Sequence, residues 1–223
     1  MKTIMKVKIA VDIGMTAVLL LLMAYGLVGE IAHEWIGIAM FALFIAHHVL
    51  NRHWFASLCK GRYTPQRILI TATLILILIC MFGSMISGII ISRYIFTFIP
   101  GGTNELIATI HTLCAYWGFV LMSLHLGEHW NMILAVTGKH LKPSKLRKWI
   151  LRTVGYMIAI YGIFAFVHHD IGVYLLLKSH FVFFNYTEPV IFFLSDYLAV
   201  MGLFVLIGYY LFRFIGYVQS VHK

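Results

Sequence analysis

Four of the twelve histidines in this sequence form two pairs with the same spacing. His33 and His47 lie 14 residues apart in one apolar segment, and His111 and His125 lie 14 residues apart in another. At about 3.6 residues per turn, the members of each pair project from nearly one face of a helix, about 21 Å apart along its axis. Each segment therefore presents one imidazole near each of its ends.

Imidazoles at two depths suit the chemistry of two b-type hemes. Heme iron accepts two axial ligands, and histidines on facing helices of a bundle supply them. Helices over the two segments would run in the same direction, because another apolar segment returns the chain between them. We expect His33 to face His111 near the outer surface and His47 to face His125 near the inner one. These four side chains are the predicted axial ligands of the heme iron.

Nearby residues agree with this prediction. Gly37 and Gly118 would let a flat macrocycle approach, and Arg52 and Arg93 could pair with heme propionates at either surface. A zinc site fits less well, because zinc ligands cluster around one point and 14-residue gaps keep these histidines apart. A packing role is the remaining alternative, although ionisable groups at membrane depth are functional candidates by default.

The other histidines are less regular. His48 projects about 100° away from His47. His53 could equally lie at the membrane interface or belong to a quinone or propionate site. His129 follows His125 by one turn and could line a quinone pocket, bind a propionate or simply lie at the interface. Five more are expected to be solvated at the two surfaces: His140, His168, His169, His180 and His222.

Long apolar segments must position these side chains. The 223 residues are 61% hydrophobic and 11% charged, whereas a soluble domain carries about a quarter charged residues. A helix needs roughly 20 apolar residues to cross a bilayer, where it satisfies its own backbone. The first apolar segment is longer than that of a cleavable signal, so we expect it to be retained. Six segments qualify approximately: 9–28, 31–54, 67–91, 105–133, 150–168 and 189–212.

The net charge of +9 is explained by topology. With six spans and an inner N-terminus, all of the 17 Lys and Arg residues except Arg93 and Lys178 fall on the cytoplasmic side. Orientation follows this bias, so both termini are expected in the cytoplasm. Anionic lipid accounts for the basic residues, and we expect no nucleic-acid partner. The three cysteines form no paired motif.

Histidine content divides the chain into parts. We expect an all-α integral membrane protein with a four-helix cytochrome b-like core over 1–137. A basic cytoplasmic loop over 138–152, in which Pro143 would stop a helix, precedes a two-helix extension over 153–223. Two external loops are aromatic or apolar. The loop over 93–104 contains a Pro-Gly-Gly turn, and the loop over 170–188 is expected in the outer interface.

Several short strings resemble those of the diheme b-type cytochromes. The chain resembles cytochrome b561-like proteins, the cytochrome b subunits of formate dehydrogenase and hydrogenase, and a bacterial family catalogued as domain of unknown function 4405. The resemblance covers approximately residues 9–135. It rests on the strings VDIGM (11–15), GEIAHE (29–34), HHVLN (47–51) and HLGEHW (125–130).

This resemblance implies two bis-histidine b hemes on the same four histidines. It also implies electron exchange with the menaquinone or ubiquinone pool of a bacterial cytoplasmic membrane. A further implication is association with an extracytoplasmic protein that carries covalent FMN. No FMN-attachment motif occurs in this chain, so the flavin would belong to that partner. The family core does not account for the last two helices.

The leading hypothesis is a quinol-linked conduit for electrons across the membrane, with quinol oxidoreductase activity. Glu34, Glu105 and His129 are candidates for a quinone site, while Asp12 and Glu128 lie toward the inner side. Two alternatives stay open. One is a self-contained superoxide–quinone or ferric reductase. The other is a heme-free transporter or assembly protein, although the sequence lacks paired broken helices.

Overall fold

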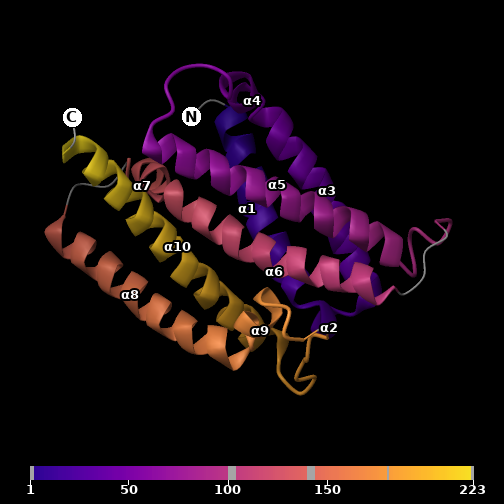
Figure 1. Ribbon diagram of the computed structural model, residues 1–223. Coiled ribbons are helices and arrows are strands. Elements are labelled where there is room, and N and C mark those ends of the chain that lie inside the picture. Colours follow the sequence, from indigo (N-terminus) through magenta and orange to yellow (C-terminus); the bar gives the residue numbers. More distant parts are fainter. Residues whose placement is uncertain (1–2, 100–103, 140–143, 180, 222–223) are drawn as a thin grey trace.

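The computed structural model describes residues 3–99, 104–139, 144–179 and 181–221. Every regular element in these ranges is a helix, which confirms the predicted all-α class (Figure 1). Along the chain the helices are α1 (Thr3–Met23), α2 (Tyr25–Val28), α3 (Glu30–Leu50), α4 (His53–Ser57), α5 (Pro65–Ile91), α6 (Glu105–Glu128), α7 (Trp130–Gly138), α8 (Lys145–His168), α9 (Ile171–Leu175) and α10 (Val190–Val221).

Five of these helices are long and apolar enough to cross a membrane: α3, α5, α6, α8 and α10. They correspond to the last five of the six predicted segments and indicate a multi-pass membrane protein. The first predicted segment does form a helix, α1. However, α1 carries Lys6, Lys8 and Asp12 and is not among the five candidate spans.

The predicted boundaries shift where the chain turns locally. The segment predicted over 31–54 ends as α3 at Leu50, and the chain resumes in the short helix α4. The segment predicted over 105–133 ends at Glu128, because His129 leaves helical geometry with φ −93° and ψ 2°. Helix α8 begins earlier than predicted, at Lys145, because the Ser144 hydroxyl accepts a hydrogen bond from a backbone N–H of its first turn. Pro143 lies outside the described residues.

Helix α6 is central to the bundle and packs against α5 and α10 (Figure 1). Helix α8 packs on α10, and α1 packs on α3. Helices α3 and α6, which carry the paired histidines, make few close backbone contacts with each other. Side chains rather than close backbone packing therefore connect these two helices.

Glycines bring the backbones of α6, α8 and α10 together. A Cβ atom on Gly127 of α6 would lie 2.3 Å from the carbonyl oxygen of Val205, and one on Gly208 of α10 would lie 2.3 Å from that of Leu124. Gly162 makes the same approach from α8 to α10. Small residues allow this approach between membrane helices. The predicted two-helix extension is therefore packed directly against the predicted core.

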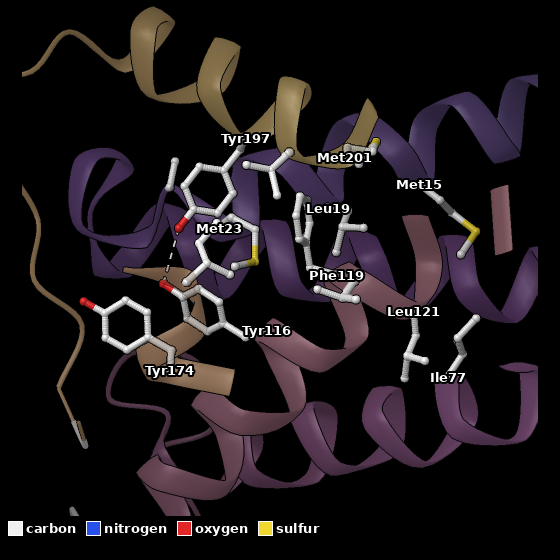
Figure 2. Close-up of a cluster of buried hydrophobic side chains, with 14 of the residues drawn as sticks. Met15, Leu19, Met23, Ile77, Tyr116, Phe119, Leu121, Tyr174, Tyr197 and Met201 are labelled. Carbon is white, nitrogen blue, oxygen red and sulfur yellow. Dashed lines mark hydrogen bonds between the residues drawn. The ribbon is translucent and has the colours of Figure 1, made fainter. Parts of the chain in front are cut away.

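Apolar side chains fill the centre of the bundle (Figure 2). Met15, Leu19 and Met23 recur every four residues on α1, so one face of this helix is buried. They belong to the same cluster as Phe119 of α6 and Met201 of α10. Although α1 is not among the five candidate spans, it thus contributes a full stripe to the core.

The two ends of the bundle differ in charge. The start of α1, the end of α10, α4 and α7 lie at one end, whereas α2 and α9 lie at the other (Figure 1). Arg93 and Lys178 belong to the second end, close to α5's last turn and to α9. The first end carries the other described basic residues: Lys6, Lys8, Arg52, Lys60, Arg62, Arg67, Lys139, Lys145, Arg147, Lys148, Arg152 and Arg213.

The apolar loop over 170–188 packs partly onto the bundle. Ile171 and Tyr174 of α9 are buried, whereas Phe181 and Phe183 are exposed. Phe184 lies against Gly26, where any Cβ atom would meet its ring at 2.5 Å. This loop therefore covers the second end of the bundle. The Pro-Gly-Gly turn of the other predicted loop lies outside the described residues.

The glycine contact between α6 and α10 is testable. Gly208→Leu would place a side chain where the Leu124 carbonyl oxygen lies, so we expect the free energy of unfolding to fall by about 1–3 kcal/mol. The midpoint of thermal unfolding in detergent measures this loss. Gly155→Ala on α8 is the control, because a Cβ atom there meets nothing within 4 Å. Equal midpoints for the two variants would contradict the close packing.

Candidate functional site

The outer pair of predicted ligands comes together in the structure. The ring centroids of His33 on α3 and His111 on α6 lie 6.2 Å apart, with the ring planes at 77°. A metal–imidazole bond is about 2 Å long, so two imidazoles on opposite sides of one metal ion have centroids about 6 Å apart. A separation of this size would suit two imidazoles that hold one metal ion, and it also lies within the ordinary range for edge-to-face ring contacts.

Helix α5 holds His111 in place. Nδ1 of His111 lies 2.9 Å from the carbonyl oxygen of Ser84 and 3.1 Å from the hydroxyl oxygen of Ser87. Gly88 makes room for the ring, because a Cβ atom there would lie 3.2 Å from His111 Cε1. Both contacts engage Nδ1, so Nε2 is left for a ligand bond, as is usual for histidines that bind metal.

His33 is held mainly by packing. The Tyr25 ring meets it edge-on with centroids 5.0 Å apart, and the Tyr25 hydroxyl donates to Glu30 at 3.1 Å. Nδ1 of His33 is buried and has no hydrogen-bond partner in the described part of the chain. A buried imidazole nitrogen without a partner is costly, and a cofactor could satisfy it.

The inner pair has different contacts. His47 on α3 lies 2.8 Å from Asp12 of α1 through Nδ1. The ring of His125 on α6 meets that of His129, with centroids 4.7 Å apart. No contact joins His47 to His125 among the described residues. The structure therefore brings each inner ligand candidate next to a different neighbour, and not into contact with its predicted partner.

A buried carboxylate lies beside His125. Glu128 is 4% exposed, and its Oε1 accepts a hydrogen bond of 2.7 Å from the Thr73 hydroxyl of α5. Its Oε2 lies 3.4 Å from His125 Nδ1, within ion-pair distance. The same two atoms lack a well-aligned hydrogen bond, so the contact is electrostatic rather than a good hydrogen bond.

A pocket opens next to these residues at the basic end of the bundle. Its volume is about 400 Å³, and α4 and α5 supply most of its lining. Three apolar side chains line it, Trp54, Ile70 and Leu74, together with six polar or charged ones: Ser57, Thr64, Gln66, Arg67, Thr71 and His129. A volume of this size lies within the usual range for small-molecule sites. Of the three predicted quinone-site residues, His129 is the one that lines it.

The other two quinone candidates lie at the opposite end. Glu34 accepts hydrogen bonds from the Ser92 hydroxyl at 2.8 Å and from the backbone N–H groups of Arg93 and Ile95 at 2.8 and 2.9 Å. Both of its oxygens are thus engaged in holding the end of α5 to α3. Glu105 is exposed in the first turn of α6, where a carboxylate is favoured by the helix dipole.

The remaining predicted residues take surface positions. Arg93 is exposed and lies 3.7 Å from Glu30, and Arg52 is exposed at the start of α4. Gly118 faces Cys80 of α5 and not α3, whereas a Cβ atom on Gly37 would meet nothing within 4 Å. Of the two glycines predicted to admit a macrocycle, Gly37 therefore has open space beside it.

His169 departs from its predicted solvated state. Its Nε2 lies 3.0 Å from Asp196 Oδ2, and its side chain is only 11% exposed. His168 beside it is exposed, as predicted. His140, His180 and His222 lie outside the described residues.

Several residues with a part in these sites were not found from the sequence. Ser84, Ser87 and Gly88 form a small polar patch in the apolar helix α5, and this composition is a signal that could have placed them near a ligand. Thr73 and Asp196 are each a polar residue within an apolar run, and this is the same kind of sequence signal.

Comparison with known proteins adds no relative. No family model, no curated protein and no solved structure matches this chain. The resemblance to diheme b-type cytochromes therefore stays a prediction that rests on the strings and the histidine spacing.

The buried Thr73–Glu128 contact yields a stability prediction. Thr73→Val leaves a buried carboxylate oxygen without its donor, so we expect the free energy of unfolding to fall by about 1–3 kcal/mol. Thr137→Val on α7 is the control, because that exposed hydroxyl bonds only to backbone of its own helix. Thermal unfolding in detergent compares the two. A Thr73 variant as stable as the Thr137 variant would show that Glu128 does not depend on this bond.

Proposed function

We propose that this chain transfers electrons across a bacterial cytoplasmic membrane on two b-type hemes and exchanges them with the quinone pool. The observation that carries the proposal is the meeting of His33 and His111, at a ring separation of 6.2 Å, between helices that make few backbone contacts. Two ionisable side chains that meet at membrane depth are candidates for a functional site, and a shared metal is the function that two imidazoles suit.

A heme supplies a reversible one-electron carrier when it is bound. His33 and His111 would hold one heme at the outer level, and His47 and His125 the other at the inner level. His33 fits this role through a buried nitrogen, since its Nδ1 has no hydrogen-bond partner among the described residues.

The contacts of the other ring nitrogens support the same assignment. A histidine that binds metal through one nitrogen usually presents the other to a carboxylate or a backbone carbonyl. His47 presents Nδ1 to Asp12 at 2.8 Å, and His111 presents Nδ1 to the Ser84 carbonyl at 2.9 Å. His125 has Glu128 at 3.4 Å from the same atom. Three of the four candidates thus share one orientation in which Nε2 is available.

The inner pocket is our proposed quinone site. It is bordered by His129, whose ring contacts that of His125. A quinol bound there could release protons to the imidazole of His129, with the buried Glu128 beside His125 as a further acceptor. Menaquinone and ubiquinone share the ring chemistry that this pocket would receive.

The distribution of charge supports the orientation. Described basic residues gather at the end that holds the start of α1 and the end of α10, and such an end faces the cytoplasm. In this arrangement α1 serves as a sixth span and both termini are cytoplasmic. The His33–His111 level then lies near the outer surface, where an FMN-carrying protein could exchange electrons.

The pairing of ligands can be tested with double variants. Removing both ligands of one heme should leave the other in place, so His33→Ala/His111→Ala should retain one heme per chain. His33→Ala/His125→Ala should retain none, because it breaks both pairs. Heme extraction from protein purified in detergent measures the content. The exposed His53→Ala variant should keep two, and the same content in both double variants would contradict the pairing.

The quinone site has its own test. Thr71→Trp would fill the pocket, so reduction of the protein by a soluble quinol should slow at least tenfold. Reduction by dithionite, which needs no pocket, should be unchanged. Ile68→Trp is the control, because that side chain is exposed on the same helix and is not part of the lining. Equal quinol rates in the two variants would place quinone elsewhere.

A further inference from the structure

A second group of potential metal ligands lies at the outer end of α8 and α10, away from the paired histidines. His168, His169 and Asp196 each offer one ligand atom, and these atoms all lie within 4.8 Å of one another. The two histidines end α8, and Asp196 lies in the second turn of α10. Neither the heme ligands nor the quinone pocket includes these residues.

The carboxylate of Asp196 is held in a fixed orientation. Its Oδ1 accepts a hydrogen bond of 2.6 Å from the Tyr161 hydroxyl, and its Oδ2 lies 3.0 Å from His169 Nε2. Asp196 is 7% exposed, and no Lys or Arg pairs with it in the described part of the chain. His169 is an ion-pair partner of Asp196 when its imidazole is protonated, and a bound cation would stabilise the buried carboxylate when the imidazole is neutral.

Both imidazoles are also positioned by aromatic neighbours. The His169 ring packs against Phe193 and Tyr197, with centroids 5.1 and 5.4 Å away. The His168 ring stacks on Phe164 at 5.6 Å, with an interplanar angle of 8°. The two rings lie with centroids 5.0 Å apart, at the point where α8 ends and Asp170 turns the chain with φ 50°.

A simple His169–Asp196 bond would explain only part of this arrangement. It would satisfy the buried carboxylate but give His168 no role. Two imidazoles and one carboxylate form a ligand set that zinc and other divalent transition metals use. Because His168 is exposed, an ion could enter from the outer surface and keep an open coordination position there.

We propose that His168, His169 and Asp196 form a binding site for a divalent transition metal ion, with the Zn²⁺ ion as the simplest occupant. Tyr161 is a positioning residue, because its hydroxyl orients Asp196 without reaching the ion. The site joins the ends of α8 and α10, so a bound ion also stabilises the fold. It lies apart from the electron-transfer residues, and it stands whether or not the chain binds heme.

Zinc binding to the purified full chain tests the site. The protein, in detergent, without an affinity tag and stripped with a chelator, is equilibrated with zinc chloride, and zinc per chain is measured by mass spectrometry. We expect one Zn²⁺ per chain and a raised unfolding midpoint, since binding to the native state stabilises it. Heme iron is counted separately in the same sample, so failure of either proposal is visible by itself.

Variants assign the ligands. His168→Ala removes an exposed side chain and should fold normally, while zinc affinity falls at least tenfold and the zinc-induced rise in unfolding midpoint disappears. Tyr161→Phe should weaken binding roughly 10- to 100-fold, as loss of an orienting partner does. His53→Ala, an exposed histidine at the other end, should bind zinc as the unaltered chain does. No zinc on the unaltered chain, or equal affinity in the His168 variant, would overturn the proposal.

Discussion

Imidazoles among membrane helices must find partners without help from water. In this bundle the polar neighbours come from other helices in two cases and from the same helix in one. His47 is served by Asp12 of α1, His111 by the Ser84 carbonyl of α5, and His125 by Glu128 of its own helix. These contacts require α1 and α5 to lie beside the helices that carry the histidines. Polar contacts thus accompany the packing of α1 on α3 and of α5 on α6.

Close packing elsewhere leaves α3 apart from α6. Gly127 and Gly208 bring α6 against α10, and Gly83 brings α5 so close to α6 that a Cβ atom there would lie 2.5 Å from Cys114 Sγ. Helix α3 packs instead on α1. As a result, α6 meets α3 mainly through side chains, and the meeting of His33 with His111 is one of those contacts.

Much of this architecture could be predicted from the sequence, because apolar length and helical period act locally. The five candidate spans follow from these two features alone. Contacts between helices depend on rotation and register, which no local pattern supplies. The Asp12–His47 and His169–Asp196 contacts are of this kind, and the second overturned the expectation that His169 is solvated. The predicted start of helix α8 was wrong, because a capping hydrogen bond at Ser144 sets where this helix begins.

The central claim is that the paired histidines hold two b-type hemes, and the heme content of the unaltered chain tests it most directly. The measurement is a reduced-minus-oxidised absorbance spectrum of protein purified in detergent, with extracted heme counted per chain. The account predicts a b-type spectrum and two hemes per chain. A folded, helical chain that carries no heme after expression with heme supplied would contradict it.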